Sequence, residues 1–204
     1  MKLYYAPGTC AFAVHTALIW CGADYEIEKV KLGSDAYKKI NPMGAVPALI
    51  DGDSGVMTQL TSLLKYLCRK YPDKNIGDLD GSKNEQALDQ WLAFLGSDLH
   101  PAFGPFFSTK LFTTKHDEDS LNAIREAVEK RLDNIYRVLD QHLEGKDYIV
   151  GNKKSVADAY AYIITTWVGY TGLNLDDYPN VKRLFNKMAQ DPGIIQAREE
   201  EGLR

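Results

Sequence analysis

The stretch Asn41-Pro42-Met43-Gly44-Ala45-Val46-Pro47-Ala48-Leu49-Ile50 joins a turn-forming segment to a short apolar segment through a Val-Pro step. Proline cannot donate a hydrogen bond to a β-ladder, so Pro47 indicates a strand at the edge of a sheet. Peptide bonds before proline also adopt the cis form at low cost. A cis bond here would turn the Val46 N–H and C=O outward, where they could pair with an extended peptide ligand. The alternative is an ordinary turn followed by a buried strand.

The residues before this stretch predict a strand, a helix and a second strand. Residues 3–6 are β-forming, and apolar residues then recur at helical spacing from Cys10 to Cys21. Gly22 supplies the left-handed conformation that ends many helices. Residues 25–32 favour a second strand, and the polar residues 33–40 predict a connection with room for one helical turn.

The residues after the stretch complete a compact α/β unit. Residues 48–50 are predicted to form a strand, 51–55 carry a hairpin signal, and Val56-Met57 would be the returning strand. Thr58 would cap and begin a helix, because leucines follow it at helical spacing. The order is therefore β-α-β, a connection, and β-β-α, which predicts an α/β domain over residues 1–72.

The second half of the chain changes to helical patterns. The polar, glycine-containing residues 73–82 predict a linker. Beyond it, apolar residues step by three or four along several segments, which predicts an all-helical bundle over residues 83–204. The segments are 88–99, 121–143, 156–167 and 181–188, with a last short helix over 193–201. Ser155 and Asp158 match a capping box at the start of the third segment.

Composition argues against several classes of function. A net charge of −4 without a basic run argues against nucleic-acid binding, and no apolar run is long enough to span a membrane. The N-terminus lacks the apolar core of a signal peptide. Three cysteines without a CxxC pair disfavour a disulfide framework and a zinc site, so we expect a cytoplasmic protein without a metal.

The segment Pro7-Gly8-Thr9-Cys10 places a thiol where a strand meets the start of a helix. Unpaired N–H groups and the positive end of the helix dipole favour an anion there, so we expect a lowered pKa for this thiol. The alternative is a half-buried structural cysteine. No second cysteine lies within one turn, but a single thiol can form a mixed disulfide with a small thiol.

The segment Thr58-Gln59-Leu60-Thr61-Ser62 lies at the start of the next predicted helix. Free N–H groups at a helix start can hold a carboxylate, and the Gln59 side chain can both donate and accept hydrogen bonds. The alternative is a plain helix cap by Thr58. Together with Val46-Pro47 and Cys10, this segment describes a site for a short peptide that carries a thiol and a carboxylate.

The whole chain resembles the cytosolic glutathione transferases, and among them the bacterial beta class. The resemblance runs nearly from end to end, and its motifs span both predicted domains. They are Met1–Cys10, Asn41–Leu49, Trp91-Leu92, Leu99-His100 and Val156–Tyr160. The resemblance implies a thioredoxin-like N-terminal domain, a helical C-terminal domain and a cytoplasmic homodimer. It also implies a detoxification enzyme that joins the glutathione thiolate to electrophiles.

The resemblance further implies roles for individual residues. Pro47 would be cis, Val46 would pair with the cysteinyl backbone of glutathione, and Cys10 would lie beside the glutathione sulfur. His100 would lie near the same sulfur as a hydrogen-bond donor or base, with an ordering role between the domains as its alternative. Tyr5 is the rival stabiliser of the thiolate, with packing beside the pocket as its alternative. Thiol-disulfide exchange or peroxidase activity through Cys10 is a further expectation.

Two sets of residues are expected to contact the two substrates. Those for glutathione are Ala45, Val46, Pro47, Gln59 and Leu60. The apolar second substrate would lie against aromatic rings, although such stripes also form ordinary cores. The rings are Phe103, Phe106, Phe107, Trp167 and Tyr170.

Departures from the family pattern support a second hypothesis. Leu60 stands where the family has serine or glycine, which removes a hydroxyl for the γ-glutamyl carboxylate, although Thr61 or Ser62 could compensate. Ala93 stands in place of a frequent asparagine. A lost hydrogen bond to a charged group costs ~1.5–3 kcal/mol, which weakens binding roughly ten- to a hundredfold. The alternative function is a non-catalytic, glutathione-transferase-like binding or regulatory protein with a weakened glutathione site.

Overall fold

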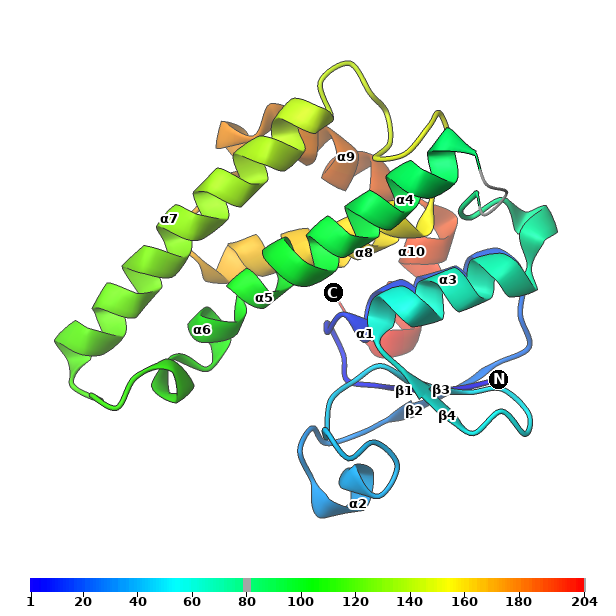
Figure 1. Cartoon of the computed structure of the whole chain (residues 1–204), viewed down its shortest axis with the longest axis horizontal. Helices are drawn as coiled ribbons and strands as arrows, with labels where there is room; N and C mark the ends of the chain where they lie inside the picture. Colours follow the sequence, from blue (N-terminus) through cyan, green and yellow to red (C-terminus); the bar gives the residue numbers. More distant parts are fainter. Residues whose placement is uncertain (79–81, 204) are drawn as a thin grey trace.

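The computed structural model describes residues 1–78 and 82–203, which form an N-terminal domain with one sheet and a helical C-terminal domain (Figure 1). The strands are β1 (Lys2–Tyr5), β2 (Glu26–Lys29), β3 (Ala48–Ile50) and β4 (Val56–Thr58). Their order in the sheet is β2-β1-β3-β4, in which only β1 and β2 are parallel. The β-α-β and β-β-α order predicted from the sequence is confirmed, although β2 ends at Lys29 rather than at residue 32.

The strand after Pro47 lies inside the sheet and its Ala48 and Leu49 are fully buried, so the edge reading is wrong and the alternative of a buried strand is confirmed. β3 pairs with β1 on one side and with β4 on the other, and Ala48 is opposite both Tyr4 and Thr58. The sheet accommodates the proline because Pro47 lies just before the first residue of the ladder, where its missing N–H is not needed. The peptide bond between Val46 and Pro47 is cis, as expected.

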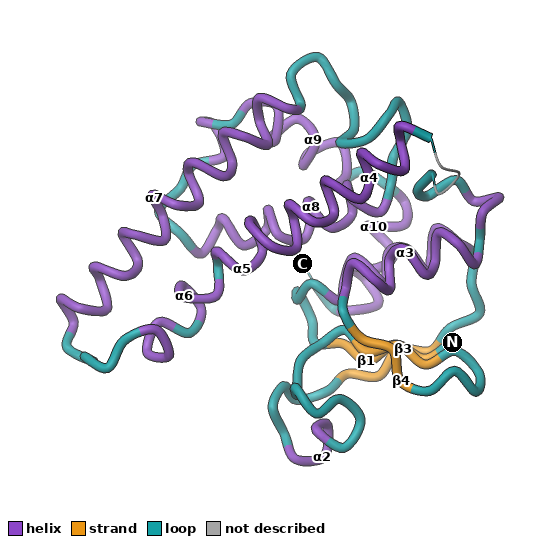
Figure 2. The backbone as a smooth tube through the Cα atoms, in the orientation of Figure 1, coloured by secondary structure: helices purple, strands orange, loops and turns teal. Residues whose placement is uncertain are grey.

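Helix α1 (Ala11–Cys21) forms the centre of the molecule. It lies with α3 (Leu60–Lys70) on one face of the sheet, and α2 (Asp35–Lys38) lies on the other side of the strands (Figure 2). Every residue from Ala11 to Leu18 is buried, because α8 (Val156–Thr166) and α10 (Pro192–Glu201) cover the side of α1 that the sheet leaves open.

The C-terminal domain is a bundle of helices, as the apolar spacing predicted, with the buried α8 inside it and the long α7 along its outer side (Figure 1). The helices of this domain contact one another and, through α8 and α10, helix α1 of the N-terminal domain. They are α4 (Lys83–Phe94), α5 (His100–Ala102), α6 (Gly104–Phe107), α7 (Glu118–His142), α8, α9 (Pro179–Ala189) and α10. None of the helices in the described residues is long and apolar enough to cross a membrane.

The segment between the domains was predicted as a linker over residues 73–82. Residues 72–74 form one 3₁₀ turn, and residues 79–81 lie outside the described residues. The predicted capping box is present at the start of α8, where the Ser155 N–H donates to the Asp158 carboxylate at 2.7 Å. That carboxylate also accepts the Ile149 N–H at 2.8 Å, which ties the preceding loop to the helix start.

Candidate functional site

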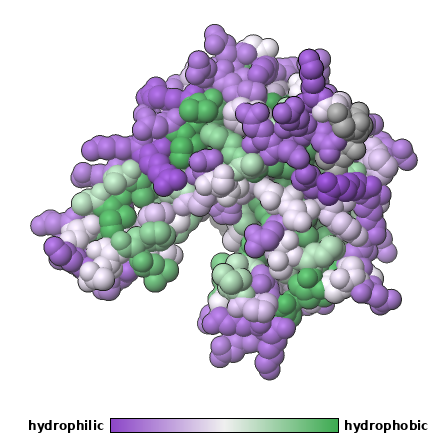
Figure 3. Space-filling view, viewed as in Figure 1, coloured by the Kyte–Doolittle hydropathy of each residue, from purple (hydrophilic) through white to green (hydrophobic). Residues whose placement is uncertain are grey.

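Two adjoining cavities lie where the domains meet, and Figure 3 shows a notch between the two halves of the molecule on this side. The first cavity is about 540 Å³ and the second about 820 Å³, both within the range of roughly 300–1,000 Å³ that is typical of small-molecule sites. Residues of both domains line each cavity. Five of them line both cavities, and these are Cys10, Ala45, Val46, His100 and Pro101.

All five residues expected to bind glutathione line the first cavity. They are Ala45, Val46, Pro47, Gln59 and Leu60. Two hydrogen bonds hold the loop before β3 in place. The Asn41 and Tyr37 side chains donate them to the Ala45 C=O, at 2.6 and 3.0 Å. The Asn41 side chain also accepts the Met43 N–H at 3.2 Å, and this supporting role of Asn41 was not predicted from the sequence. The Val46 N–H has no hydrogen-bond partner among the described residues, so it is available to a ligand.

The start of α3 forms the opposite wall of the first cavity. The expectation that Thr58 begins this helix is wrong, because Thr58 is the last residue of β4 and Gln59 follows it at a φ of +70°. Within the described residues, the Gln59 and Thr61 side chains have no hydrogen-bond partner, and neither have the N–H groups of residues 60–62. An uncapped helix start beside a cavity is a binding site for an anion such as a carboxylate.

Leu60 does not fill the first cavity, despite its size. Its side chain packs into the main hydrophobic core and is only 7% exposed. The cavity wall at this point is completed by Thr61, whose γ-methyl group approaches Gly96 of the segment that follows α4. A β-carbon at position 96 would lie 3.1 Å from that methyl group, so a glycine allows the close approach.

Cys10 lines both cavities, but its thiol pKa is shifted in the direction opposite to the expected one. The side chain is 7% exposed, and burial raises the pKa to about 12 although the backbone N–H groups of Cys10 and Ala11 lower it. Removing a thiolate from water costs more free energy than hydrogen bonds from these two N–H groups recover. The Cys10 thiol instead donates to the Val46 C=O at 3.5 Å, which requires the protonated form.

We therefore predict that alkylation of Cys10 by iodoacetamide in the free protein accelerates roughly tenfold for each pH unit between about pH 7 and pH 9, because the reactive thiolate remains a small fraction throughout. Peptide mass spectrometry would follow the residue, with Cys10→Ala as the control. A rate that reaches a plateau near neutral pH would contradict the prediction and indicate a lowered pKa.

His100 lies at the junction of the two cavities, directly after a π-helical segment (Leu95–Leu99). Its Nδ1 is 2.7 Å from the Tyr160 Oη, and its ring lies 5.0 Å from the Trp167 ring. Burial lowers the pKa of His100 to about 4, so the imidazole is neutral at physiological pH. Tyr160 lines the first cavity and was not among the residues expected in the site.

Tyr5 lies outside both cavities, so the structure does not bring it to the predicted site. Its side chain is 7% exposed and packs with Tyr4, Ala11 and Val46 in a small second core. Burial and the nearby Glu201 raise the pKa of its phenol. The packing alternative therefore describes Tyr5 better than a role as thiolate stabiliser.

The second cavity is walled by aromatic rings, as expected, with one correction. Four of the five expected rings line it, namely Phe106, Phe107, Trp167 and Tyr170. The fifth, Phe103, is fully buried and does not line the cavity. Its ring packs against the rings of Phe107 and Trp167, at centroid distances of 6.0 and 5.5 Å. Asp, Glu, Lys and Arg are missing from the described lining of this cavity, which suits a neutral, apolar ligand.

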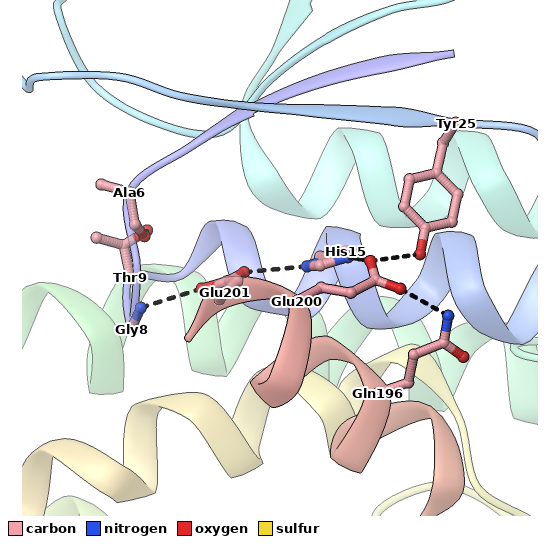
Figure 4. A network of polar contacts seen from close by, with 8 residues as sticks. All are labelled: Ala6, Gly8, Thr9, His15, Tyr25, Gln196, Glu200 and Glu201. Carbon is pink, nitrogen blue, oxygen red and sulfur yellow. Dashed lines mark hydrogen bonds and ion pairs between the residues drawn. The ribbon is translucent and has the colours of Figure 1, made fainter. Parts of the chain in front are cut away.

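The loop before Cys10 is held by the C-terminal domain (Figure 4). The Gly8 N–H donates to the Glu201 carboxylate at 3.1 Å. The Gly8 C=O accepts the Trp167 indole N–H at 2.9 Å. Glu201 also contacts His15 Nδ1 at 3.2 Å, and Glu200 contacts His15 Nε2 at 2.7 Å. The last turn of α10 therefore fixes the loop that carries the thiol.

No group of three or more His, Cys, Asp or Glu side chains in the described parts of the chain is arranged to hold a metal ion. The three cysteines are buried and unpaired.

The comparisons with known proteins agree over the whole chain. Two family models match, the N-terminal domain of glutathione S-transferase over residues 8–70 and its C-terminal domain over residues 103–192. A glutathione S-transferase of Xanthomonas campestris is 30% identical, and the alignment covers all of both chains. The structure of a sphingomonad glutathione S-transferase complexed with glutathione is 33% identical, with full coverage of both chains and a TM-score of 0.87. A bacterial beta-class glutathione S-transferase of Sphingomonas chungbukensis is 32% identical, with full coverage and a TM-score of 0.88.

Proposed function

The chain belongs to the glutathione S-transferase family, and we propose that it joins the thiolate of glutathione to small electrophilic molecules. The observation that carries the proposal is the junction of two different cavities at Cys10 and His100. One cavity offers unpaired backbone N–H groups and a free helix start, and the other offers aromatic rings. A thiol and an electrophile bound in adjoining cavities meet at that junction, which turns a reaction between two molecules into one within a complex.

We propose one orientation for glutathione in the first cavity, based on the groups that line it. Its cysteinyl backbone pairs with the free Val46 N–H, and its γ-glutamyl carboxylate lies on the start of α3, beside Gln59 and Thr61. Its sulfur then lies beside Cys10 and His100. The thiol loses its proton to solvent, and the thiolate attacks the electrophile, so that a sulfur–carbon bond forms and a leaving group departs.

The second cavity holds the electrophile. We propose neutral aromatic compounds for it, because the lining carries four aromatic rings and no charged side chain among the described residues. In this division of roles, residues 1–72 bind glutathione, residues 73–82 connect, and residues 83–204 provide the hydrophobic-substrate site. We also propose that the protein acts in detoxification as a cytoplasmic homodimer, with buried unpaired cysteines as expected in a reducing compartment.

Thiol-disulfide exchange through Cys10 is a side activity that the same geometry supports, because Cys10 lines the first cavity. The Cys10 thiolate would attack the disulfide of oxidised glutathione bound there. A mixed disulfide between Cys10 and one glutathione would form, and the other glutathione would leave in its reduced form. Nothing in the described residues favours the alternative of a non-catalytic protein, since Leu60 is in the core and the first cavity is open.

Calorimetry with reduced glutathione, followed by turnover of a neutral aromatic electrophile with a chloride leaving group, tests the proposed function. We expect saturable binding below millimolar concentration and a rate that depends on both substrates. Absence of heat with millimolar glutathione would overturn glutathione binding, and binding without turnover would leave a binding protein instead of a transferase.

Thr61 is predicted to take over the role of the hydroxyl that Leu60 lacks. Thr61→Val keeps the shape of the side chain and removes its hydroxyl, so we expect a KM for glutathione raised about tenfold with little change in kcat. Ser62→Ala is the matched control, because Ser62 does not line the cavity. An unchanged KM in Thr61→Val, or an equal rise in both variants, would contradict the prediction.

A further inference from the structure

Tyr160 and His100 form a buried pair at the meeting point of the two cavities. The Tyr160 Oη and the His100 Nδ1 are 2.7 Å apart, and the two rings meet edge to face at 85°. Tyr160 is 1% exposed, and Trp167 packs against the His100 ring from another direction. The hydrogen bond to Tyr160 and the contact with Trp167 together restrict the orientation of the imidazole in the site.

The proton positions in this pair follow from its contacts. Burial raises the pKa of Tyr160 and lowers that of His100, so the phenol keeps its proton and the imidazole carries only one. Among the described residues, the Tyr160 Oη has no hydrogen-bond partner other than His100 Nδ1. The described residues offer the hydroxyl proton no other acceptor, so donation to Nδ1 satisfies both atoms. The phenol therefore donates, Nδ1 accepts, and the imidazole proton resides on Nε2.

We propose that Tyr160 is a positioning residue that holds His100 in the tautomer with the proton on Nε2, so that His100 donates a hydrogen bond to the reacting sulfur and does not accept its proton. The inference deepens the proposed function and rests on it for the identity of the sulfur. Within the described residues, Nε2 has no partner in the protein, although His100 lines both cavities.

A histidine beside a thiol can either donate a hydrogen bond to the sulfur or accept its proton, and the position of the imidazole proton decides between these two roles. With Nε2 already protonated, the ring offers the sulfur a donor, which stabilises the thiolate in the low-dielectric site. The thiol proton goes to solvent, and the imidazole is unchanged by the reaction. In the opposite tautomer, Nε2 would be an acceptor facing the lone pairs of the thiolate, and this arrangement would repel the nucleophile.

The tautomer can be measured directly in the free, full-length protein by ¹⁵N NMR of the histidine ring nitrogens. We expect His100 to show a protonated Nε2 and an unprotonated Nδ1 in the wild-type protein. In Tyr160→Phe, which removes only the hydroxyl, we expect a mixture of both tautomers. A wild-type protein with the proton on Nδ1, or an unchanged spectrum in Tyr160→Phe, would overturn the proposal.

The catalytic consequence is tested with a double-mutant cycle. We expect Tyr160→Phe to lower kcat about tenfold with little change in the KM for glutathione. His100→Gln keeps a donor near the position of Nε2 without a tautomer, so Tyr160→Phe should cause no further loss in that background. Tyr162→Phe is the matched control, because Tyr162 is a buried tyrosine of the same helix that stacks on Phe185, away from both cavities.

An equal loss from Tyr160→Phe in both backgrounds would overturn the proposal, because Tyr160 would then act independently of His100. The two arms also separate this inference from the proposed function. A protein that does not bind glutathione would refute the transferase assignment, whereas the nitrogen spectra would still confirm or overturn the tautomer.

Discussion

Replacing Asp158 by asparagine is expected to lower the free energy of unfolding by about 3 kcal/mol, although the side chain keeps its size. Three donors reach the two carboxylate oxygens. The Ile149 N–H donates to one at 2.8 Å, and the Ser155 N–H and hydroxyl donate to the other at 2.7 and 3.0 Å. An asparagine has a single acceptor oxygen, and its NH₂ group would face an N–H in either orientation.

The loss of stability in Asp158→Asn is large because water does not reach the side chain at position 158. Asp158 is fully buried, and burial raises its pKa to about 6 although the hydrogen bonds lower it. In the variant, at least one buried backbone N–H loses its acceptor and lies opposite another donor, which adds a desolvation penalty to the lost bond. The loop around Ile149 and the first turn of α8 would separate, and α8 carries Tyr160 and leads to Trp167.

Urea unfolding followed by circular dichroism measures this effect, at one fixed protein concentration and near pH 8, where the carboxylate is ionised. Ser155→Ala is the control, since it removes the serine hydroxyl but keeps the carboxylate and both backbone donors, and it should cost about 1 kcal/mol. An Asp158→Asn protein as stable as the wild type would show that the carboxylate contributes nothing beyond its shape.

Local patterns in the sequence predicted most of the secondary structure. Gly22 ends α1 in the left-handed conformation at a φ of 61°, and the apolar spacing of residues 121–143 gave the length of α7. Each of these signals depends only on residues within one or two turns, and so does the capping box. The misplaced start of α3 has the same origin, since leucine spacing marks the helix but does not reveal that Thr58 pairs with Ala48.

The chemistry of the site was less predictable, because it depends on burial and on contacts between distant residues. The start of α1 was visible in the sequence, so a lowered thiol pKa was expected, but the cover that raises the pKa of Cys10 comes from the loop at Val46 and from α8. The bond between His100 and Tyr160 joins residues 60 positions apart. Family resemblance identified His100, yet only the fold identifies its partner.

The contact between the Gly8 N–H and the Glu201 carboxylate leads to the second prediction with a large effect. Glu201→Ala is expected to lower the free energy of unfolding by about 3 kcal/mol and to slow mixed-disulfide formation at Cys10 about tenfold. Glu201 accepts the Gly8 N–H, 193 positions away in the chain, and its side chain is fully buried beside His15. The alanine variant leaves the buried His15 Nδ1 and the half-buried Gly8 N–H without this partner, and it releases one of the two anchors of the loop that carries Cys10.

Glu201→Gln distinguishes the hydrogen bonds from the charge. A glutamine oxygen can still accept the Gly8 N–H, and its NH₂ group can donate to His15 Nδ1 while the His15 Nε2–H donates to Glu200. We therefore expect this variant to lose only about 1 kcal/mol and to keep most of the Cys10 reactivity. Glu200→Ala is the matched control, because Glu200 contacts His15 and Tyr25 but not Gly8.

Treatment with oxidised glutathione, followed by mass spectrometry of the Cys10 peptide over time, would measure the reactivity, and urea unfolding would measure the stability. If the loop is held through Glu201, Glu201→Ala should slow the reaction while Glu200→Ala changes it by less than about twofold. Equal slowing in both variants would mean that α10 acts through general stability and not through the Gly8 contact. An unchanged Cys10 rate in Glu201→Ala would show that the Trp167 bond alone suffices to hold the loop.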